Sequence, residues 1–164
     1  LVLPYESIVI SLYYTMKSYN LSNTYWSLIL PQIGLSIPFS IFWLRASFKA
    51  IPKSLSEAAM IEGAGRFTIL IKILIPQMIP AILTLTVLLF MWTWNEFLLA
   101  LIMIQDADMR TAPLALSYFA GNKRYGDPAI TAAAAIWVAL PVLIMYVFLQ
   151  RRFISGMVTG AVKE

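Results

Sequence analysis

The sequence predicts an all-α, multi-spanning membrane protein, because long apolar runs are separated by short charged segments. Of the 164 residues, 60% are hydrophobic and only 12% are charged, which is about half the charged share of a soluble domain. Three runs are long enough to cross a bilayer core of roughly 30 Å as helices. Helices of soluble proteins alternate apolar and polar faces, and these runs do not, so we expect a polytopic helix bundle in lipid.

Charged residues bound the three predicted spans. The spans are expected over residues 24–44, 77–104 and 128–150. Glu96 is the only charge within the second run, and Arg151 and Arg152 stop the third at the level of the headgroups. Prolines occur inside all three spans, so we expect kinked helices whose freed carbonyls find partners on neighbouring segments.

The first sixteen residues form a shorter apolar segment. Residues 1–16 carry one charge, Glu6, but sixteen residues are fewer than the roughly 20 that a crossing needs. We interpret this segment as the end of a truncated span, so the chain is expected to start internally.

The positions of Lys and Arg predict which connections are cytoplasmic. Eight of these cations fall in segments 45–72 and 151–164, whereas the opposite side holds four, at residue 17 and within 105–127, where three aspartates dilute them. Cytoplasmic connections carry the cation excess in membrane proteins. We therefore expect a cytoplasmic loop at 48–76, a cytoplasmic tail at 151–164 and an external loop at 105–127.

Composition excludes several classes of function. The chain has no Cys and no His, so it lacks thiol nucleophiles, imidazole bases and the usual zinc ligands, and we expect no metal, cofactor or catalytic residue. The charges lie in narrow strips between apolar runs, a placement that argues against a nucleic-acid partner. A membrane-embedded enzyme using Glu57 or Glu96 is a weak alternative, because neither acid has a Ser or His partner.

The first cytoplasmic loop predicts a short helix. Ser54 followed three residues later by Glu57 is a capping box, which starts a helix, and Gly63 or Gly65 is suited to end it. One face of this helix is expected to hold Leu55, Ala58, Ala59 and Glu62. Small side chains on one face suit docking into a groove of another protein, and periodicity alone is equally consistent with a connector lying on the headgroups.

Several spaced residues in and after this loop occur together. They are Glu57, Ala58, Ala59, Gly63, Ala64, Ile73, Pro76 and Pro80. This set resembles the EAA motif of permease subunits of binding-protein-dependent ABC importers, with Ile75 in place of the usual Leu before the proline. Residues 21–26, 94–98 and 156–163 are similar to the carbohydrate branch, of the maltose and glycerol-phosphate type. The resemblance covers the whole chain and corresponds to the C-terminal portion of such a subunit.

The resemblance implies a function and a set of partners. It implies the type I ABC importer permease fold in a bacterial or archaeal cytoplasmic (inner) membrane, importing a sugar or a related small solute. The implied partners are ABC ATPase subunits that hydrolyse the ATP, a second permease subunit and an external solute-binding protein. In the family the EAA helix sits in a cleft of the ATPase, so Glu57 would contact that subunit and Gly63 would permit the sharp turn. The alternative is a secondary transporter or channel that is not driven by ATP. Such a protein would not need the EAA spacing, so the presence of this spacing favours the ABC permease.

The acid within the second span suggests a second site. A carboxylate inside an apolar segment is costly and is expected to face the bundle interior or water. In one interpretation Asn95 and Glu96 line the solute path together with Trp92 and Trp94, whose rings would stack on sugar faces. In the other, Glu96 bonds to a neighbouring helix near the outer interface and the two Trp belong to the interfacial aromatic belt.

Overall fold

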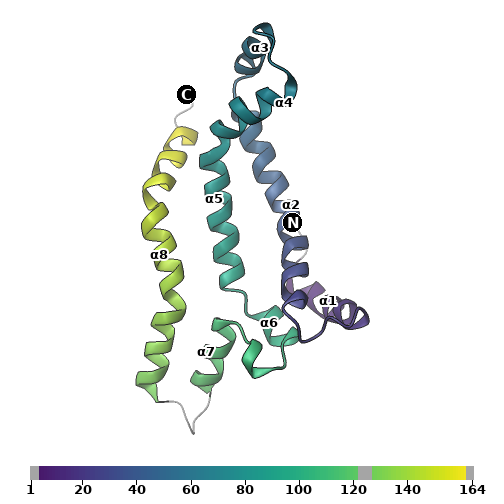
Figure 1. The fold of residues 1–164 in the computed structure, drawn as a ribbon. Coiled ribbons are helices and arrows are strands. Elements are labelled where there is room, and N and C mark those ends of the chain that lie inside the picture. The colour runs from purple at the N-terminus through teal and green to yellow at the C-terminus, as the bar shows by residue number, and fades with distance from the viewer. Residues whose placement is uncertain (1–3, 122–126, 162–164) are drawn as a thin grey trace.

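The computed structural model describes the backbone of residues 4–121 and 127–161, and the side chains of residues 4–120 and 127–148. Every regular element in these ranges is helical, and none is a strand. The α-helices (Figure 1) are α1 (Glu6–Ser18), α2 (Trp26–Ala50), α3 (Lys53–Ile61), α4 (Arg66–Ile69), α5 (Ile75–Trp94), α6 (Leu98–Met103), α7 (Ala112–Gly121) and α8 (Pro128–Ala161). The predicted all-α class is confirmed.

Three long helices form the body of the molecule, with α5 between α2 and α8 (Figure 1). The segments long and apolar enough to cross a membrane are Trp26–Ala50, Arg66–Trp94 and Pro128–Phe148. Only 17%, 17% and 0% of their most apolar stretches are buried within the chain. Their exposed apolar side chains therefore require lipid or further protein around them, which agrees with the predicted membrane bundle.

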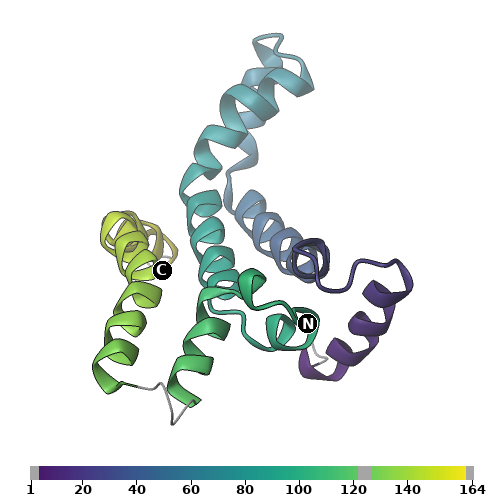
Figure 2. The same cartoon turned by 60° about the horizontal axis from the view of Figure 1, so that its bottom comes forward.

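The second of these helices differs from the predicted span over residues 77–104. Helix α5 ends at Trp94, and the short helix α6 follows after residues 95–97 in a new direction (Figure 2). The break occurs where Asn95 and Glu96 interrupt the apolar run, because both side chains bond backbone groups at the two helix ends.

The other expected segments also contain helices. Helix α1 turns across the lower end of α2 instead of running beside it (Figures 1 and 2). The external loop expected at 105–127 contains α7, which packs against α8; residues 122–126 lie outside the described part. Helix α8 continues to Ala161, so the backbone of the expected tail is largely helical, and its side chains lie outside the described residues.

The densest packing lies at the lower end of the molecule, opposite α3. A hydrophobic core joins α1, the start of α2, α6 and α7. Its buried members are Val9, Met16, Leu28, Leu99, Ala100, Met103, Ile104 and Leu114. We call this unit, formed by α1, residues 19–28, α6 and the segment up to α7, the outer block.

Prolines shape the helices at the other end. Pro52 pushes the preceding residue, Ile51, into an extended conformation (ψ 128°), which ends α2 at Ala50. A π-helical turn, Leu70–Leu74, lies just before Pro76, whose missing N–H leaves the carbonyl of Lys72 without its usual partner. A π-turn pairs each carbonyl with the N–H five residues on, so it bypasses the missing donor.

Two tryptophan side chains tie the three long helices together. The indole N–H of Trp43 on α2 donates to the carbonyl of Ala81 on α5 at 3.0 Å, and that of Trp94 on α5 donates to the carbonyl of Val138 on α8 at 2.9 Å. In an apolar environment such bonds stabilise the contact between helices, since neither group can bond water.

The Trp43 bond can be tested with Trp92 as a matched control. Trp92 is 54% exposed, and no hydrogen bond of its indole occurs in the described part of the chain. Trp43→Phe should lower the free energy of unfolding in detergent by about 0.6 kcal/mol or more, whereas Trp92→Phe should change it little. Equal losses in the two variants, measured by denaturant titration, would contradict the anchoring role.

Candidate functional site

The predicted helix of the cytoplasmic loop is present as α3, but it starts differently from the expectation. Its N-cap is Pro52 (ψ 131°), and no side chain caps it. The capping box expected from Ser54 and Glu57 is therefore wrong, because Ser54 already lies in the first helical turn. Pro52 has no N–H, which removes one unpaired donor from this helix end, and the N–H of Leu55 donates to the Pro52 carbonyl at 3.2 Å.

Gly63 ends α3 as expected. It has a positive φ of 83°, its N–H donates to the carbonyl of Met60 at 3.0 Å, and the N–H of Ala64 donates to the carbonyl of Ala59 at 2.9 Å. These two bonds define a Schellman motif, the helix ending that a left-handed glycine permits. The same motif commonly brings the residue at the position of Ala64 against the one at the position of Ala59.

Of the four residues expected on one face of α3, Leu55, Ala58 and Glu62 are exposed, whereas Ala59 is not. Ala59 is buried, at 6% exposure, and packs inward, whereas Ala58 is exposed. Helical spacing places the exposed residues Ser54, Glu57, Ala58 and Ile61 on one outward face. The inward position of Ala59 follows from the Schellman ending, so Gly63 was the sequence feature from which it could have been predicted.

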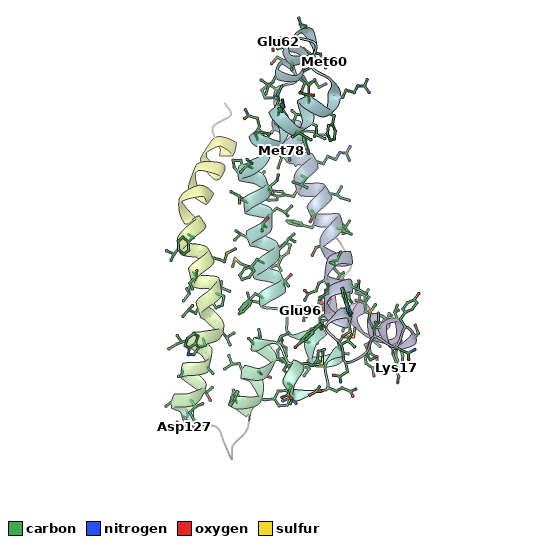
Figure 3. All side chains as sticks on the ribbon, in the orientation of Figure 1. Lys17, Met60, Glu62, Met78, Glu96 and Asp127 are labelled. Atoms are coloured by element: carbon green, nitrogen blue, oxygen red, sulfur yellow. The ribbon has the colours of Figure 1, made fainter. Side chains whose placement is uncertain are left out.

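Sequence reasoning missed two large apolar side chains at this end. Ile61 is 88% exposed and Phe67, on α4, is 74% exposed. Met60 and Glu62, labelled in Figure 3, lie at the same tip of the molecule. Their position in a cation-rich loop outside the spans was the available signal. An exposed apolar pair on a projecting tip is typical of a surface that another molecule covers.

Charge distinguishes the two ends of the molecule. Arg45 and Lys49 at the end of α2, Lys53 on α3 and Arg66 on α4 lie at the tip that carries α3. At the opposite end, the guanidinium of Arg110 lies 3.8 Å from the ring centre of Tyr118. The end that carries α3 thus holds the cations on which the predicted cytoplasmic placement rests.

The second candidate site is the break between α5 and α6. Asn95 is the C-cap of α5, and its amide nitrogen donates to the carbonyl of Met91 at 2.7 Å. The side chain is exposed, and its carbonyl oxygen makes no hydrogen bond in the described part. Asn95 therefore retains a free acceptor at the end of the long helix.

Glu96 caps the start of α6. Its carboxylate accepts hydrogen bonds from the backbone N–H groups of Leu99 (2.7 Å) and Ala100 (3.1 Å), and from the hydroxyl of Tyr5 (3.0 Å). These donors satisfy N–H groups that the first turn of a helix leaves unpaired. Figure 3 shows Glu96 at the junction between the long helices and the outer block. Its contacts favour the structural interpretation of this acid over the pathway one.

Trp94 is also engaged within the protein. Besides its bond to Val138, its ring stacks on Phe90 with the ring centres 5.7 Å apart. The exposed ring of Trp92 meets Phe39 of α2 edge-on, at 4.8 Å between centres. Of the two rings, Trp92 has the free face that a solute would need.

The two candidate sites lie at opposite ends of α5. Its 20 residues correspond to about 30 Å at the rise of an α-helix. The described residues contain no cluster of acids that would hold a metal ion. The loop around α3 and the break at Asn95 are thus separate sites connected by long helices.

Comparison with known proteins identifies the family. Residues 1–157 match the model of the binding-protein-dependent transport system inner membrane component. The chain is 36% identical over 163 residues to a probable ABC transporter permease protein, YurM, of Bacillus subtilis, covering 99% of this chain and 54% of that protein.

Several relatives have names that specify a solute, among them the following two. The sulfoquinovosyl glycerol transport system permease protein SmoH of Agrobacterium fabrum is 35% identical over 160 residues, which are 98% of this chain and 56% of SmoH. The trehalose transport system permease protein SugB of Mycobacterium tuberculosis is 34% identical over 161 residues, which are 98% of this chain and 59% of SugB. The chain thus spans little more than half the length of these relatives, and it belongs to the family of inner membrane components of binding-protein-dependent transport systems.

Proposed function

We propose that this chain is the translocating part of a permease subunit of an ATP-driven importer, and that the loop around α3 couples it to a separate ATPase subunit. The observation that carries the proposal is the projecting tip, where a rigidly ended helix presents Glu57, Ala58 and Ile61 to solvent. The family match supports it, because relatives named as ABC transporter permeases align over nearly the whole chain.

The exposure and contacts of the residues around α3 support a role for each in the proposed coupling. Ala58 is small and exposed, so a partner surface can approach the helix closely there, and Glu57 beside it offers a charge for an ionic contact. Ala59 and Ala64 hold the helix in place through the Schellman ending, and Gly63 permits that ending. The docking surface thus comprises Glu57, Ala58 and Ile61, with Ala59, Gly63 and Ala64 supporting it.

The partners and the solute follow from the same proposal. The assembly comprises ATP-binding subunits on the cytoplasmic side, a second permease subunit and an external solute-binding protein, in a bacterial or archaeal cytoplasmic membrane. Relatives named for trehalose and sulfoquinovosyl glycerol transport favour a sugar or a glycoside as the solute. The solute path passes the free acceptor oxygen of Asn95 and the exposed ring of Trp92. Glu96 and Trp94 do not line the path but stabilise the break between α5 and α6 through their hydrogen bonds.

Gly63 should be essential for coupling, and Gly65 provides a matched control. An added Cβ would meet nothing within 4 Å at either position, but only Gly63 has a positive φ, whereas Gly65 is extended (φ −67°). Gly63→Val should strain the turn by about 1 kcal/mol or more and reduce solute-stimulated ATPase activity of the assembled importer, while Gly65→Val should retain it. Normal stimulated activity in the Gly63 variant would refute the role of the turn.

Ile61 should contribute to association with the ATPase. Because its side chain is 88% exposed, Ile61→Lys should leave the fold intact while placing a charge where an apolar contact is expected. Co-purification of the ATPase subunit should fall by about tenfold or more. The same loss is expected when Glu57 and Ala58 are exchanged for Lys and Trp. As a control, Ile61→Val should co-purify with the ATPase as the parent does. Retained association of both charged variants would argue against docking at this tip.

Asn95 should affect solute handling rather than ATPase association. Loss of one hydrogen bond to a neutral hydroxyl costs about 1 kcal/mol, so Asn95→Ala should raise the KM for uptake several-fold. Thr93→Ala, at an exposed position two residues earlier on α5, should leave the KM unchanged. Uptake assays with the complete importer would measure both, and an unchanged KM in the Asn95 variant would remove Asn95 from the path.

A further inference from the structure

Asn23, in the link between α1 and α2, clamps the end of α6. Its side-chain oxygen accepts hydrogen bonds from the backbone N–H groups of Gln105 and Asp106, each at 2.9 Å, and its own N–H donates to the carbonyl of Met103 at 3.1 Å. A positive φ of 57° orients the residue for these bonds, a conformation that asparagine tolerates better than most residues. One residue thus binds three backbone groups on a segment some eighty positions away.

The start of α6 is held independently. The Glu96 carboxylate bonds two N–H groups of α6 and also accepts the hydroxyl proton of Tyr5, which lies just before α1. Between the two attachments, Leu99 and Ala100 are fully buried and Met103 is 1% exposed. Both ends of α6 are therefore fastened to the chain around α1, and its middle is packed in the core of the outer block.

The links from the outer block to the long helices are unequal. Helix α2 enters the block directly, since Ser27 and Leu28 in its first turn are buried there, and it runs unbroken to Ala50, next to the tip that carries α3. Helix α5 packs along α2 and is joined in sequence to the block through residues 95–97, where the helix is interrupted. The continuous connection between the tip and the outer block is thus α2, and the joint is the break after α5.

We propose that α6, α1 and the start of α2 move as one rigid body during transport, with Asn23 and Glu96 as the positioning residues that hold α6 in it. This inference rests on the proposed function. Displacement of the tip is carried along α2 to the whole outer block, while α5 changes its angle to the block at residues 95–97. Helix α6 does not swing as a separate gate.

A reversible cross-link across the clamp tests whether its two sides move apart. The chain contains no cysteine, so the pair Asn23→Cys and Gln105→Cys can be introduced into the full-length permease within the assembled importer in proteoliposomes. A disulfide, verified by mass spectrometry, should leave at least half of the uptake rate of the reduced form. Loss of uptake on oxidation that a reductant restores would overturn the proposal, as would failure of the pair to cross-link.

Asn20 provides a matched control for the hydrogen bonds themselves. It has the same φ of 57° in the same link, but its side chain makes no hydrogen bond in the described part of the chain. Asn23→Gly keeps the backbone conformation and removes the two side-chain hydrogen bonds of the clamp, so the solute imported per ATP hydrolysed should fall by about tenfold. Asn20→Gly should leave this ratio unchanged, and Asn23→Asp, which keeps the acceptor oxygen, should restore it. An unchanged ratio in Asn23→Gly would contradict the proposal.

Failure of the rigid block is distinguishable from failure of the proposed function. If the parent assembly shows no ATP-dependent uptake, the importer assignment fails and the inference falls with it. If the reduced cysteine variant imports solute and only its oxidised form does not, the importer assignment stands and the rigid block is wrong.

Discussion

The structure depends on one constraint. In an apolar chain, a carboxylate and the unpaired backbone N–H groups at an interrupted helix must form their hydrogen bonds within the protein. Glu96 meets both requirements at once, because the N–H groups that the start of α6 exposes are the donors that its carboxylate needs. An acid that would be costly inside an unbroken helix becomes favourable at a helix start. The position of the break between α5 and α6 follows from this pairing.

The break divides the molecule into parts with different packing. Below it, α1, α6 and α7 bury most of the core residues around the start of α2. Above it, α5 packs against α2 on one side and α8 on the other, and Trp43 and Trp94 each add one hydrogen bond to these contacts. The apolar surface of the long helices is left for lipid or other protein segments, so the permease bundle combines a compact outer end with a loosely packed body.

The helical class and the approximate positions of the long helices could be predicted from apolar runs and charged boundaries. The end of α3 could be predicted to lie at Gly63 or Gly65, because glycine accepts the left-handed conformation of a helix end, and the positive φ of Gly63 decides between them. The break after Trp94 could not, since the donors to Glu96 include Tyr5, whose proximity depends on the tertiary fold. The inward position of Ala59 was not predicted, because the periodicity of Leu55, Ala58 and Ala59 does not show which side of the helix meets α4.

The residues that fix the shape of α3 are different from the residues that it exposes, and this separation affects how the tip can evolve. Its shape relies on backbone hydrogen bonds, one proline and one glycine, and on small side chains turned inward. The outward residues contribute little to that shape, so they are free to change in step with a changing partner without disturbing the fold. Under the proposed docking role, substitutions on the outward face of α3 would therefore change which partner protein binds there and leave the helix bundle unchanged.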